Sequence, residues 1–551
     1  PIIPNGGFLA VRSQGDSADL RARLAADRSA RSVVFARAGV TLAAWSQFAG
    51  QGVWQGEGGG VAFDLDLTNL PELCRLAGLP VAEVDPGELL FALYRAFGMN
   101  FCDKLRGAFA FALWDDTARK LNVVTDPYGI RPVVYTADSR HFAAASRIRH
   151  LEIAGFDKTI NPEAIYQYLF FQAICSPVSI YQGVRKLQPG GCLQVSSDAV
   201  RESSWYDLSY PVREGVSEAD WCREIAAQVE DAVARFVPQP DGGITGCFLS
   251  GGTDSSSIAG FYSRLSERPA QTFSIGFDDP KYNELDFART AANHFATRQH
   301  EYLVTPQDVL QLIHDLPRIY DEPLGNASVI AAYYCARLAR SAGIDTLLGG
   351  DGGDEIFGGN ERYVTNLVFA RYQLLPQLVR RNLFEPLLDL LPDAGVLHKA
   401  KRYVRRANMP NPRRFYSYNL LAEMDNSEIF QADFLARVDT DCFFKRADEL
   451  YQRAAPAHDT NRLLYLDMKY TITDNDLRKV TQMVEAAGLQ VRYPLLDRDL
   501  VDFCGSIPPQ LKVKPGKNRY IFKQAMRGIL PDEILTKTKH GMGLPIAKWL
   551  R

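Results

Sequence analysis

Residues 244–257 read ITGCFLSGGTDSSS. The mostly apolar residues 244–249 end at a pair of glycines and are followed by a helical pattern, which predicts a buried strand, a tight turn and the start of a helix. Adjacent glycines let backbone N–H groups approach an anion, and the helix N-terminus adds partial positive charge. The segment therefore predicts a phosphate site, with a capped turn that binds nothing as the alternative. The spacing G-x-x-x-x-G-K-[ST] of the other common phosphate loop does not occur here.

A second glycine-rich segment, 347-LLGGDGGDEIFGG-359, follows another apolar run. Its three acids have no evident packing role among so many glycines. They suit a metal–phosphate site, in which glycines bring the backbone close and carboxylates ligate Mg2+. Asp254 and Asp354 are the expected metal ligands. The acid spacing does not match a calcium loop.

Strand and helix patterns alternate around both segments. Short strands bounded by glycine and separated by helices are typical of βαβ units, so an α/β domain with a parallel sheet is predicted. Beyond Tyr363 the pattern is helical, and the basic stretch 398-HKAKRYVRR-406 is interpreted as a solvated helix face. The expected strands are 271–277, 299–304 and 344–350, and the expected helices are 255–266, 284–296 and 327–342.

The first two hundred residues follow a different pattern. Short β-type runs broken by Gly and Asp predict antiparallel strands, and two helical stretches make this part α+β. A linker containing Pro211 and Gly215 ends at Ser217, which is placed to cap a following helix. We expect domains at 1–208 and 218–551, joined by 209–217. The strand-like runs are 32–45, 107–115, 120–126 and 132–138, and the helices are 86–98 and 162–171.

The composition of the chain limits the classes of partner that we expect. The chain has 551 residues and a net charge of -3, which gives no reason to expect nucleic acid or a membrane as a partner. No apolar run reaches the roughly 18 residues of a membrane span, and the start lacks the pattern of a signal peptide. The nine cysteines show no C-x-x-C pair and no metal spacing, as in a protein of a reducing compartment. Cytoplasm is the expected location.

The two glycine segments, in this order, resemble the ATP-pyrophosphatase domain of the asparagine synthetase family. The likeness extends to 274-SIGF-277 beside adenine, 321-DEPLGNAS-328 beside the acyl substrate, 476–497 and 539–545. It implies an adenine nucleotide α-hydrolase-like fold that uses ATP and Mg2+. Lys479 and Arg492 are candidates for holding substrate or α-phosphate, with simple ion pairs as equal alternatives. The other implied ATP or pyrophosphate residues are Leu249, Ser250, Gly251, Gly252, Thr253, Asp254, Ser255, Ser256, Ser274, Ile275, Gly276, Phe277, Gly350, Asp351 and Gly352.

The amino-terminal half resembles the family's class II glutaminase domain, which implies an Ntn-hydrolase-like β-sandwich. The matching stretches are 106-RGAFAFA-112, 126-DPYGIRP-132 and 186-KLQPG-190. Active members use a cysteine at residue 1, where this sequence has Pro1, and the glutamine-holding stretch is degraded to 64-DLDLTN-69. We therefore expect a retained scaffold without glutaminase activity.

In the family, a lysine near the carboxyl end stabilises the tetrahedral transition state. The corresponding position holds Arg519, which keeps the charge and the donors but cannot release a proton. Lys517 is the alternative for this role.

The resemblance implies a ligase that adenylates a carboxylate, releases pyrophosphate and passes the acyl group to an amine. Loss of the N-terminal cysteine, together with 7–29 and 34–45, is similar to lasso-peptide cyclases, which close a macrolactam ring in a precursor peptide delivered by a leader peptidase. Alternatives are an ammonia-using asparagine synthetase, a β-lactam synthetase, whose Tyr–Glu pair is not identified in this sequence, and an inactive scaffold. The intact glycine loops count against the last. A homodimer is possible.

Overall fold

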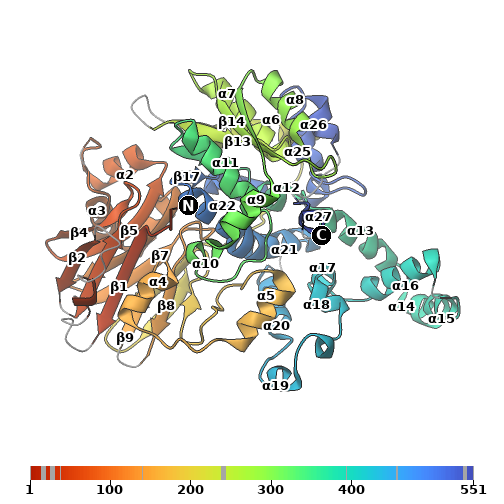
Figure 1. The fold of residues 1–551 in the computed structure, drawn as a ribbon, viewed down its shortest axis with the longest axis horizontal. Coiled ribbons are helices and arrows are strands. Elements are labelled where there is room, and N and C mark those ends of the chain that lie inside the picture. Colours follow the sequence, from red (N-terminus) through yellow and green to blue (C-terminus); the bar gives the residue numbers. More distant parts are fainter. Residues whose placement is uncertain are drawn as a thin grey trace.

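A computed structural model of the chain describes residues 2–13, 20, 22–24, 32–37, 39–82, 84–138, 141–237, 243–392, 394–454, 457–537 and 543–549. Pro1 and most of the 14–31 and 538–542 segments therefore lie outside the described residues. Figure 1 shows a strand-rich region in red to orange, an α/β body in green and blue, and a helical arm that projects from the body on the right.

The strand-rich region contains two six-stranded sheets whose paired strands are all antiparallel. The sheets pack face to face through small and aromatic side chains, among them Phe8, Ala112 and Trp114, which are fully buried. The predicted α+β class and β-sandwich are confirmed. The strand order of the first sheet is β10 (Arg185–Lys186), β8 (Val134–Ala137), β9 (His141–Ala145), β1 (Gly7–Ser13), β3 (Val40–Trp45), β2 (Ser32–Arg37). The strand order of the second sheet is β12 (Val200–Ser204), β11 (Gly191–Val195), β7 (Lys120–Thr125), β6 (Gly107–Asp115), β5 (Gly59–Leu67), β4 (Gln51–Gly56).

Helices α2 (Leu70–Ala77) and α3 (Pro86–Phe97) cover the outer face of the second sheet. The sequence predicted α3, whose N-cap Asp85 accepts hydrogen bonds from two backbone N–H groups of the first turn, but not α2. Helices α4 (Ile148–Ala154) and α5 (Pro162–Phe171) and the short helix η1 (Gly98–Lys104) complete this region.

The body is built on a five-stranded parallel sheet in the order β15 (Arg298–Leu303), β14 (Gln271–Gly276), β13 (Thr245–Phe248), β16 (Thr346–Leu348), β17 (Gln490–Arg492). This confirms the predicted α/β class. The strand order reverses between β13 and β16, and such a point is where open α/β sheets bind ligands. The sequence did not predict β17, which is only three residues long. Flanking helices are α6 (Glu218–Ala234), α7 (Thr253–Leu265), α8 (Leu285–His294), α11 (Val329–Ser341) and α22 (Leu477–Ala486).

Helix α6 begins where the capping pattern predicts. Ser217 is its N-cap and accepts a hydrogen bond from the backbone N–H of Asp220 at 3.1 Å. Trp221, Ile225 and Val229 lie on one buried face, as the helical spacing predicts. The expected linker 209–217 runs between β12 and this helix.

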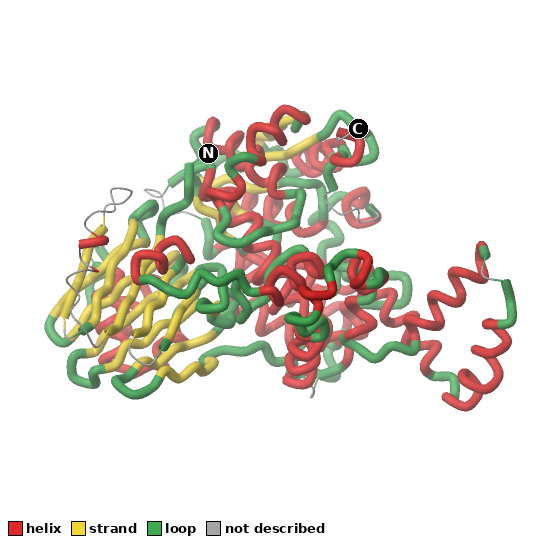
Figure 2. The backbone as a smooth tube through the Cα atoms, turned by 60° about the horizontal axis from the view of Figure 1, so that its bottom comes forward, coloured by secondary structure: helices red, strands yellow, loops and turns green. Residues whose placement is uncertain are grey.

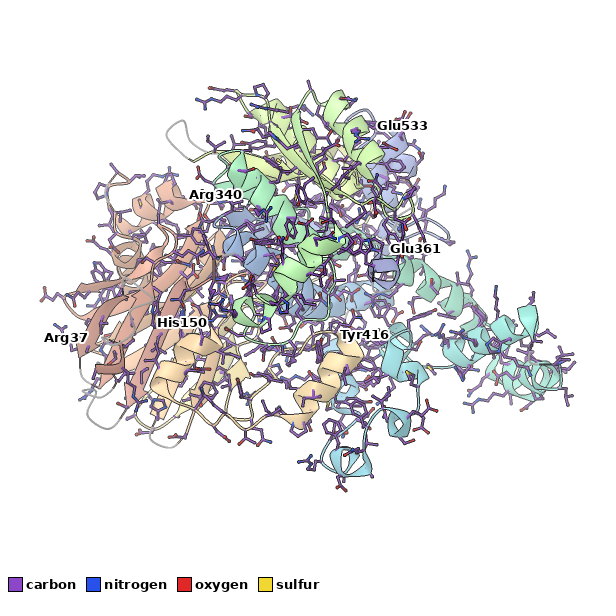
Figure 3. The ribbon with its side chains drawn as sticks, viewed as in Figure 1. Arg37, His150, Arg340, Glu361, Tyr416 and Glu533 are labelled. Carbon is purple, nitrogen blue, oxygen red and sulfur yellow. The ribbon has the colours of Figure 1, made fainter. Side chains whose placement is uncertain are left out.

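The remaining carboxyl-terminal chain is helical, as predicted. Helix α5 of the first domain packs into the core of this carboxyl-terminal part. There Phe170 packs on Phe443 beside the fully buried Tyr416, which is labelled in Figure 3. The other elements are α9 (Pro306–Ile313), α10 (Leu316–Ile319), α12 (Gly353–Phe357), α13 (Glu361–Gln373), α14 (Gln377–Val379), η2 (Arg380–Phe384), α15 (Glu385–Asp389), α16 (Gly395–Ala407), α17 (Arg413–Tyr416), α18 (Leu420–Glu423), η3 (Asn426–Glu428), α19 (Ala432–Leu435), α20 (Cys442–Arg453), α21 (Asp459–Asp467), η4 (Met468–Asp476), η5 (Pro494–Leu496), α23 (Arg498–Gly505), α24 (Pro509–Lys512), α25 (Tyr520–Ala525), α26 (Asp532–Thr536) and α27 (Ile546–Trp549).

Helices α13 to α16 form the projecting arm, which Figure 2 shows as a helical extension beyond the body. Among the residues that the structure describes, no helix is both long and apolar enough to cross a membrane.

Candidate active site

The two glycine segments meet at the reversal point of the parallel sheet. Strands β13 and β16 are direct neighbours, with Cys247 paired to Leu348, so the loops that follow them emerge side by side. At Gly350 an added Cβ would lie 3.1 Å from the backbone nitrogen of Ser255, so the loops touch through their main chains. Glycine is needed for this approach.

A cavity of about 500 Å³ opens between these loops. Its phosphate end is formed by the N-termini of α7 and α12, and its other end by apolar side chains of β14 and α11, including Ile275, Phe277 and Ala331. An apolar recess next to exposed backbone N–H groups suits a nucleotide, whose base is flat and apolar and whose phosphates are anionic.

Arg519 joins the two candidate metal ligands. Its guanidinium donates to both carboxylate oxygens of Asp254, at 2.8 and 2.7 Å, and also contacts Asp354. The residue lies at the N-cap of α25 with a φ of 51°, a left-handed conformation that is uncommon for a residue other than glycine. The side chain is buried, so its charge acts in a region of low dielectric constant.

Two glycines shape the cradle around this carboxylate pair. A Cβ on Gly353 would lie 2.5 Å from the carboxyl carbon of Asp254, and one on Gly359 would collide with Asp354. The guanidinium therefore stands where a cation is required between two carboxylates. Mg2+ commonly uses one or two carboxylates plus phosphate oxygens, which this pair fits, and no group of three or more metal-binding side chains exists among the described residues.

A second charged group lies beside the phosphate end. Burial raises the pKa of Asp351 to about 6, helped by Asp476 and Asp254 and opposed by Lys479. Lys479 donates to Asp476 at 2.6 Å, and although burial opposes it, the charges of Asp476 and Asp351 raise the pKa of this lysine. Lys479 therefore stays a cation that lines the cavity.

Two lysines that the sequence did not single out also line the cavity. Burial and the nearby Arg519 lower the pKa of Lys523, which lies one helical turn after Arg519. Lys537 forms an ion pair with Glu284 at 3.2 Å. The i, i+4 spacing from Arg519 could have identified Lys523, whereas no local pattern marks Lys537.

Most of the predicted site residues come together, and some do not. Gly251, Ser256, Ser274 and Gly276 support the loops from behind; the Ser274 hydroxyl, for example, donates to the carbonyl of Leu249 at 2.7 Å. Those that line the cavity are Leu249, Ser250, Gly252, Thr253, Asp254, Ser255, Ile275, Phe277, Gly350, Asp351, Gly352, Asp354, Lys479 and Arg519.

Two candidates lie outside the cavity. Arg492 forms a two-pronged ion pair with Asp66 of the first domain, both contacts at 2.8 Å, which supports the ion-pair interpretation over a substrate role. Lys517 is exposed, with its ammonium 6.0 Å from the ring of Tyr520. Between the two candidates for transition-state stabilisation, Arg519 is the one at the carboxylate pair.

The stretch 64–69 of the amino-terminal domain faces the second domain. Asp64 contacts Arg131 at 3.3 Å, and Arg131 in turn donates to Glu485 of α22 at 2.8 Å. Arg147 contacts the other oxygen of Glu485, and all four side chains are buried. Burial raises the pKa of Asp64, and Arg131 opposes this rise. These buried charges therefore bind the two domains together.

Comparisons with known proteins agree with this geometry. The family model described as asparagine synthase matches residues 224–551, and that described as glutamine amidotransferase domain matches 82–206. The "Asparagine synthetase [glutamine-hydrolyzing] 1" of Bacillus subtilis is 27% identical over 474 residues, which cover 84% of this chain and 72% of the relative. A "Putative asparagine synthetase [glutamine-hydrolyzing]" of Mycobacterium bovis is 28% identical over 491 residues, with coverages of 87% and 73%.

A solved structure of glutamine phosphoribosylpyrophosphate amidotransferase from B. subtilis gives a TM-score of 0.27 at 11% identity, covering 62% of this chain and 80% of that one. The family match spans more than half of the chain and includes both glycine loops and Arg519. The chain belongs to the asparagine synthase family.

Proposed function

We propose that this protein is a carbon–nitrogen ligase that forms AMP and pyrophosphate, and that it closes a macrolactam ring in a lasso precursor peptide. The observation that carries the ligase chemistry is the carboxylate pair Asp254 and Asp354, bridged by Arg519 at the junction of the two glycine loops. The family match and the names of the relatives support the same reaction class.

Each group has a role in this proposal. Backbone N–H groups from Ser250 to Thr253 bind the pyrophosphate end of ATP. Asp254 and Asp354 would hold Mg2+, which supplies positive charge to the phosphates. The substrate carboxylate attacks the α-phosphorus, the bond between the α-phosphorus and the α,β-bridging oxygen breaks, and pyrophosphate leaves with that oxygen. Lys479 steadies the charge on the α-phosphate.

Arg519 acts in the second half of the reaction. Mg2+ held by Asp254 and Asp354 would replace the guanidinium as their counter-ion, which would leave Arg519 free to face the acyl group. It then stabilises the oxyanion that forms as an amine attacks the acyl-adenylate and AMP departs. The amine loses its extra proton to solvent or to a basic group of the substrate.

The amine source decides the substrate class. In the amino-terminal domain, Asp64 and Asp66 are engaged by Arg131 and Arg492, which supports a domain without glutaminase activity. With no ammonia generated internally, an amine already present on the substrate is favoured. A peptide whose freed N-terminus attacks its own Asp or Glu side chain meets this requirement, with a leader peptidase supplying the cleaved peptide.

The test is mass spectrometry of a candidate core peptide incubated with ATP, Mg2+, this protein and its partner peptidase. We expect loss of one water per peptide, a protease-resistant product, and AMP and pyrophosphate in equal amounts. The Asp254→Ala variant should give none of these. Production of ADP and phosphate would contradict the ligase chemistry itself.

A second candidate is an asparagine synthetase-like enzyme that uses free ammonia or a small amine. The names of the relatives support asparagine synthesis, with glutamine hydrolysis printed for those relatives. This candidate predicts conversion of aspartate and ammonium to asparagine at the rate of an ordinary enzyme, with no change in any peptide. Neither candidate function uses glutamine. Release of glutamate from glutamine above background would therefore contradict both candidates.

A further inference from the structure

The carboxyl-terminal chain supplies a cation to the cavity that no step of the proposed reaction uses. Lys537 directly follows α26, a helix that packs against α8 (Figure 1). Its side chain is only 8% exposed and lines the cavity between the glycine loops. Because 286 residues separate it from Gly251, only the tertiary fold brings this ammonium to the cavity.

The ammonium of Lys537 lies against the first glycine loop. Its Nζ is 3.2 Å from Oε2 of Glu284, the N-cap of α8, and it donates to the carbonyl oxygen of Gly251 at 3.5 Å. It also lies 4.5 Å from the centre of the Phe287 ring. A Cβ on Gly251 would lie 2.5 Å from the backbone nitrogen of Ala288, so the loop itself rests on α8. The ammonium is therefore beside the backbone that is expected to hold phosphate.

These contacts do not use all the donors of the ammonium. An ammonium carries three N–H donors, and the 3.5 Å contact with the loop carbonyl is at the long limit of a hydrogen bond. Among the residues that the structure describes, no third acceptor lies within hydrogen-bond distance of Lys537. The other oxygen of Glu284, Oε1, is buried and has no hydrogen-bond partner in the same described part of the chain. The pair is thus held by one short contact.

The charge balance of the cavity indicates what the remaining donor can do. Six acidic and five basic side chains line the cavity, so its walls carry no excess of positive charge for a polyanion. Two of the cations are already paired, Lys479 with Asp476 at 2.6 Å and Arg519 with Asp254 at 2.7 Å. A group with several negative charges is bound best by cations that donate to it directly. Lys537 is placed at the glycine loop, where such a group would bind.

We propose that Lys537 binds the pyrophosphate part of ATP, and that Glu284 holds its ammonium while the site is empty. The proposal rests on the ligase chemistry proposed above and adds a residue to it. When the nucleotide enters, one N–H of Lys537 donates to an oxygen of the β- or γ-phosphate. The flexible four-carbon stem of lysine lets the ammonium turn from Glu284 to the phosphate. Glu284 then loses contact with its counter-ion, a cost that opposes binding and favours release of pyrophosphate.

The two residues are therefore expected to have opposite effects on pyrophosphate affinity. Lys537→Met removes a phosphate ligand, so it should weaken binding of pyrophosphate by about 10- to 100-fold. Glu284→Gln removes the competing carboxylate, so it should strengthen the same binding. In the double variant, Glu284→Gln should have little further effect, because the lysine that it restrains is gone. The measurement is isothermal titration calorimetry of the full chain with pyrophosphate in the presence of Mg2+.

Two controls separate a phosphate ligand from a residue that only supports the fold. Binding of AMP, measured in the same way, reports the rest of the cavity and should be unchanged in every variant. The matched variant is Lys548→Met. Lys548 is also paired with an acid of the segment before α8, Asp279 at 3.4 Å, but it is 59% exposed and lies outside the cavity. This variant should leave both affinities unchanged.

The outcomes distinguish this inference from the proposed function. Unchanged pyrophosphate binding by Lys537→Met overturns the inference. An equal loss of AMP and pyrophosphate binding also overturns it, because the lysine would then only support the fold. Weaker pyrophosphate binding by Glu284→Gln would contradict the exchange between carboxylate and phosphate. A wild type that binds neither AMP nor pyrophosphate would overturn the ligase chemistry, and this inference with it.

Discussion

Arg131 of the amino-terminal domain donates a hydrogen bond to Glu485 of α22, with Nη1 and Oε1 2.8 Å apart and both side chains buried. Glu485 lies on the helix that also carries Lys479, which lines the cavity between the glycine loops. The amino-terminal domain therefore helps to position a helix that lines this cavity.

Replacing Glu485 with Ala should destabilise the protein by about 3–5 kcal/mol, because Arg131 and Arg147 would be left as unpaired buried charges. The measurement is the urea midpoint of unfolding. The control Glu57→Ala, in the exposed turn between β4 and β5, should leave the midpoint almost unchanged. Equal midpoints for both variants would show that the ion network contributes nothing to stability.

Arg519→Met should lower kcat for product formation by about 100-fold or more, the usual effect of removing a donor to an oxyanion. Arg519→Lys should retain part of the rate because it keeps a cation at the carboxylate pair. Lys517→Met should behave like the wild type, since Lys517 is exposed and outside the cavity. The opposite ranking in a steady-state assay would transfer the role to Lys517.

Gly353→Ala should abolish ATP–pyrophosphate exchange while the melting temperature changes little. Its new Cβ would lie within 2.5 Å of the Asp254 carboxyl group and would displace a predicted Mg2+ ligand. Gly343→Ala provides the comparison, because the space around Gly343 is open. The only cost of that substitution is the strain of an alanine in a left-handed backbone conformation. Full exchange activity in the Gly353 variant would place the metal elsewhere.

Lys512→Met should stabilise the protein at pH 7 by roughly 3 kcal/mol, with a gain that shrinks as pH rises. Burial lowers the pKa of Lys512 from 10.5 to about 8. Between these values the unfolded chain binds more protons than the folded one, so the wild type gains stability with pH in this window. The difference in urea midpoint between variant and wild type, measured at pH 7 and near pH 10, reports this dependence.

The exposed Lys120→Met variant is the control for that experiment and should show no such trend. A pH-independent difference for Lys512→Met would mean that Lys512 is solvated in the folded state.

The glycine loops and their strands could be predicted because their signals are local. In 249–254 and 349–354 the turn, the helix start and the anion-binding backbone are all encoded within a few residues. Strand β17 was missed because three residues are too few to show a period, and it forms only by pairing with β16. Helix α2 was also missed. The side chain of its N-cap residue, Asn69, makes no capping hydrogen bond.

Contacts between distant segments were beyond the reach of a single sequence. Nothing near Arg492 indicates that its partner is Asp66, which lies on a strand of another domain.

The reversal of strand order between β13 and β16 has a consequence for how this enzyme can change. Both glycine loops leave the sheet along the one seam between these two strands. The excursion 277–345 lies to one side of the seam, and the excursion 359–489 returns on the other side. Either excursion can lengthen, shorten or acquire new side chains without shifting the register of the seam. The fold thus keeps the two glycine loops in one fixed register while the segments around them are free to differ.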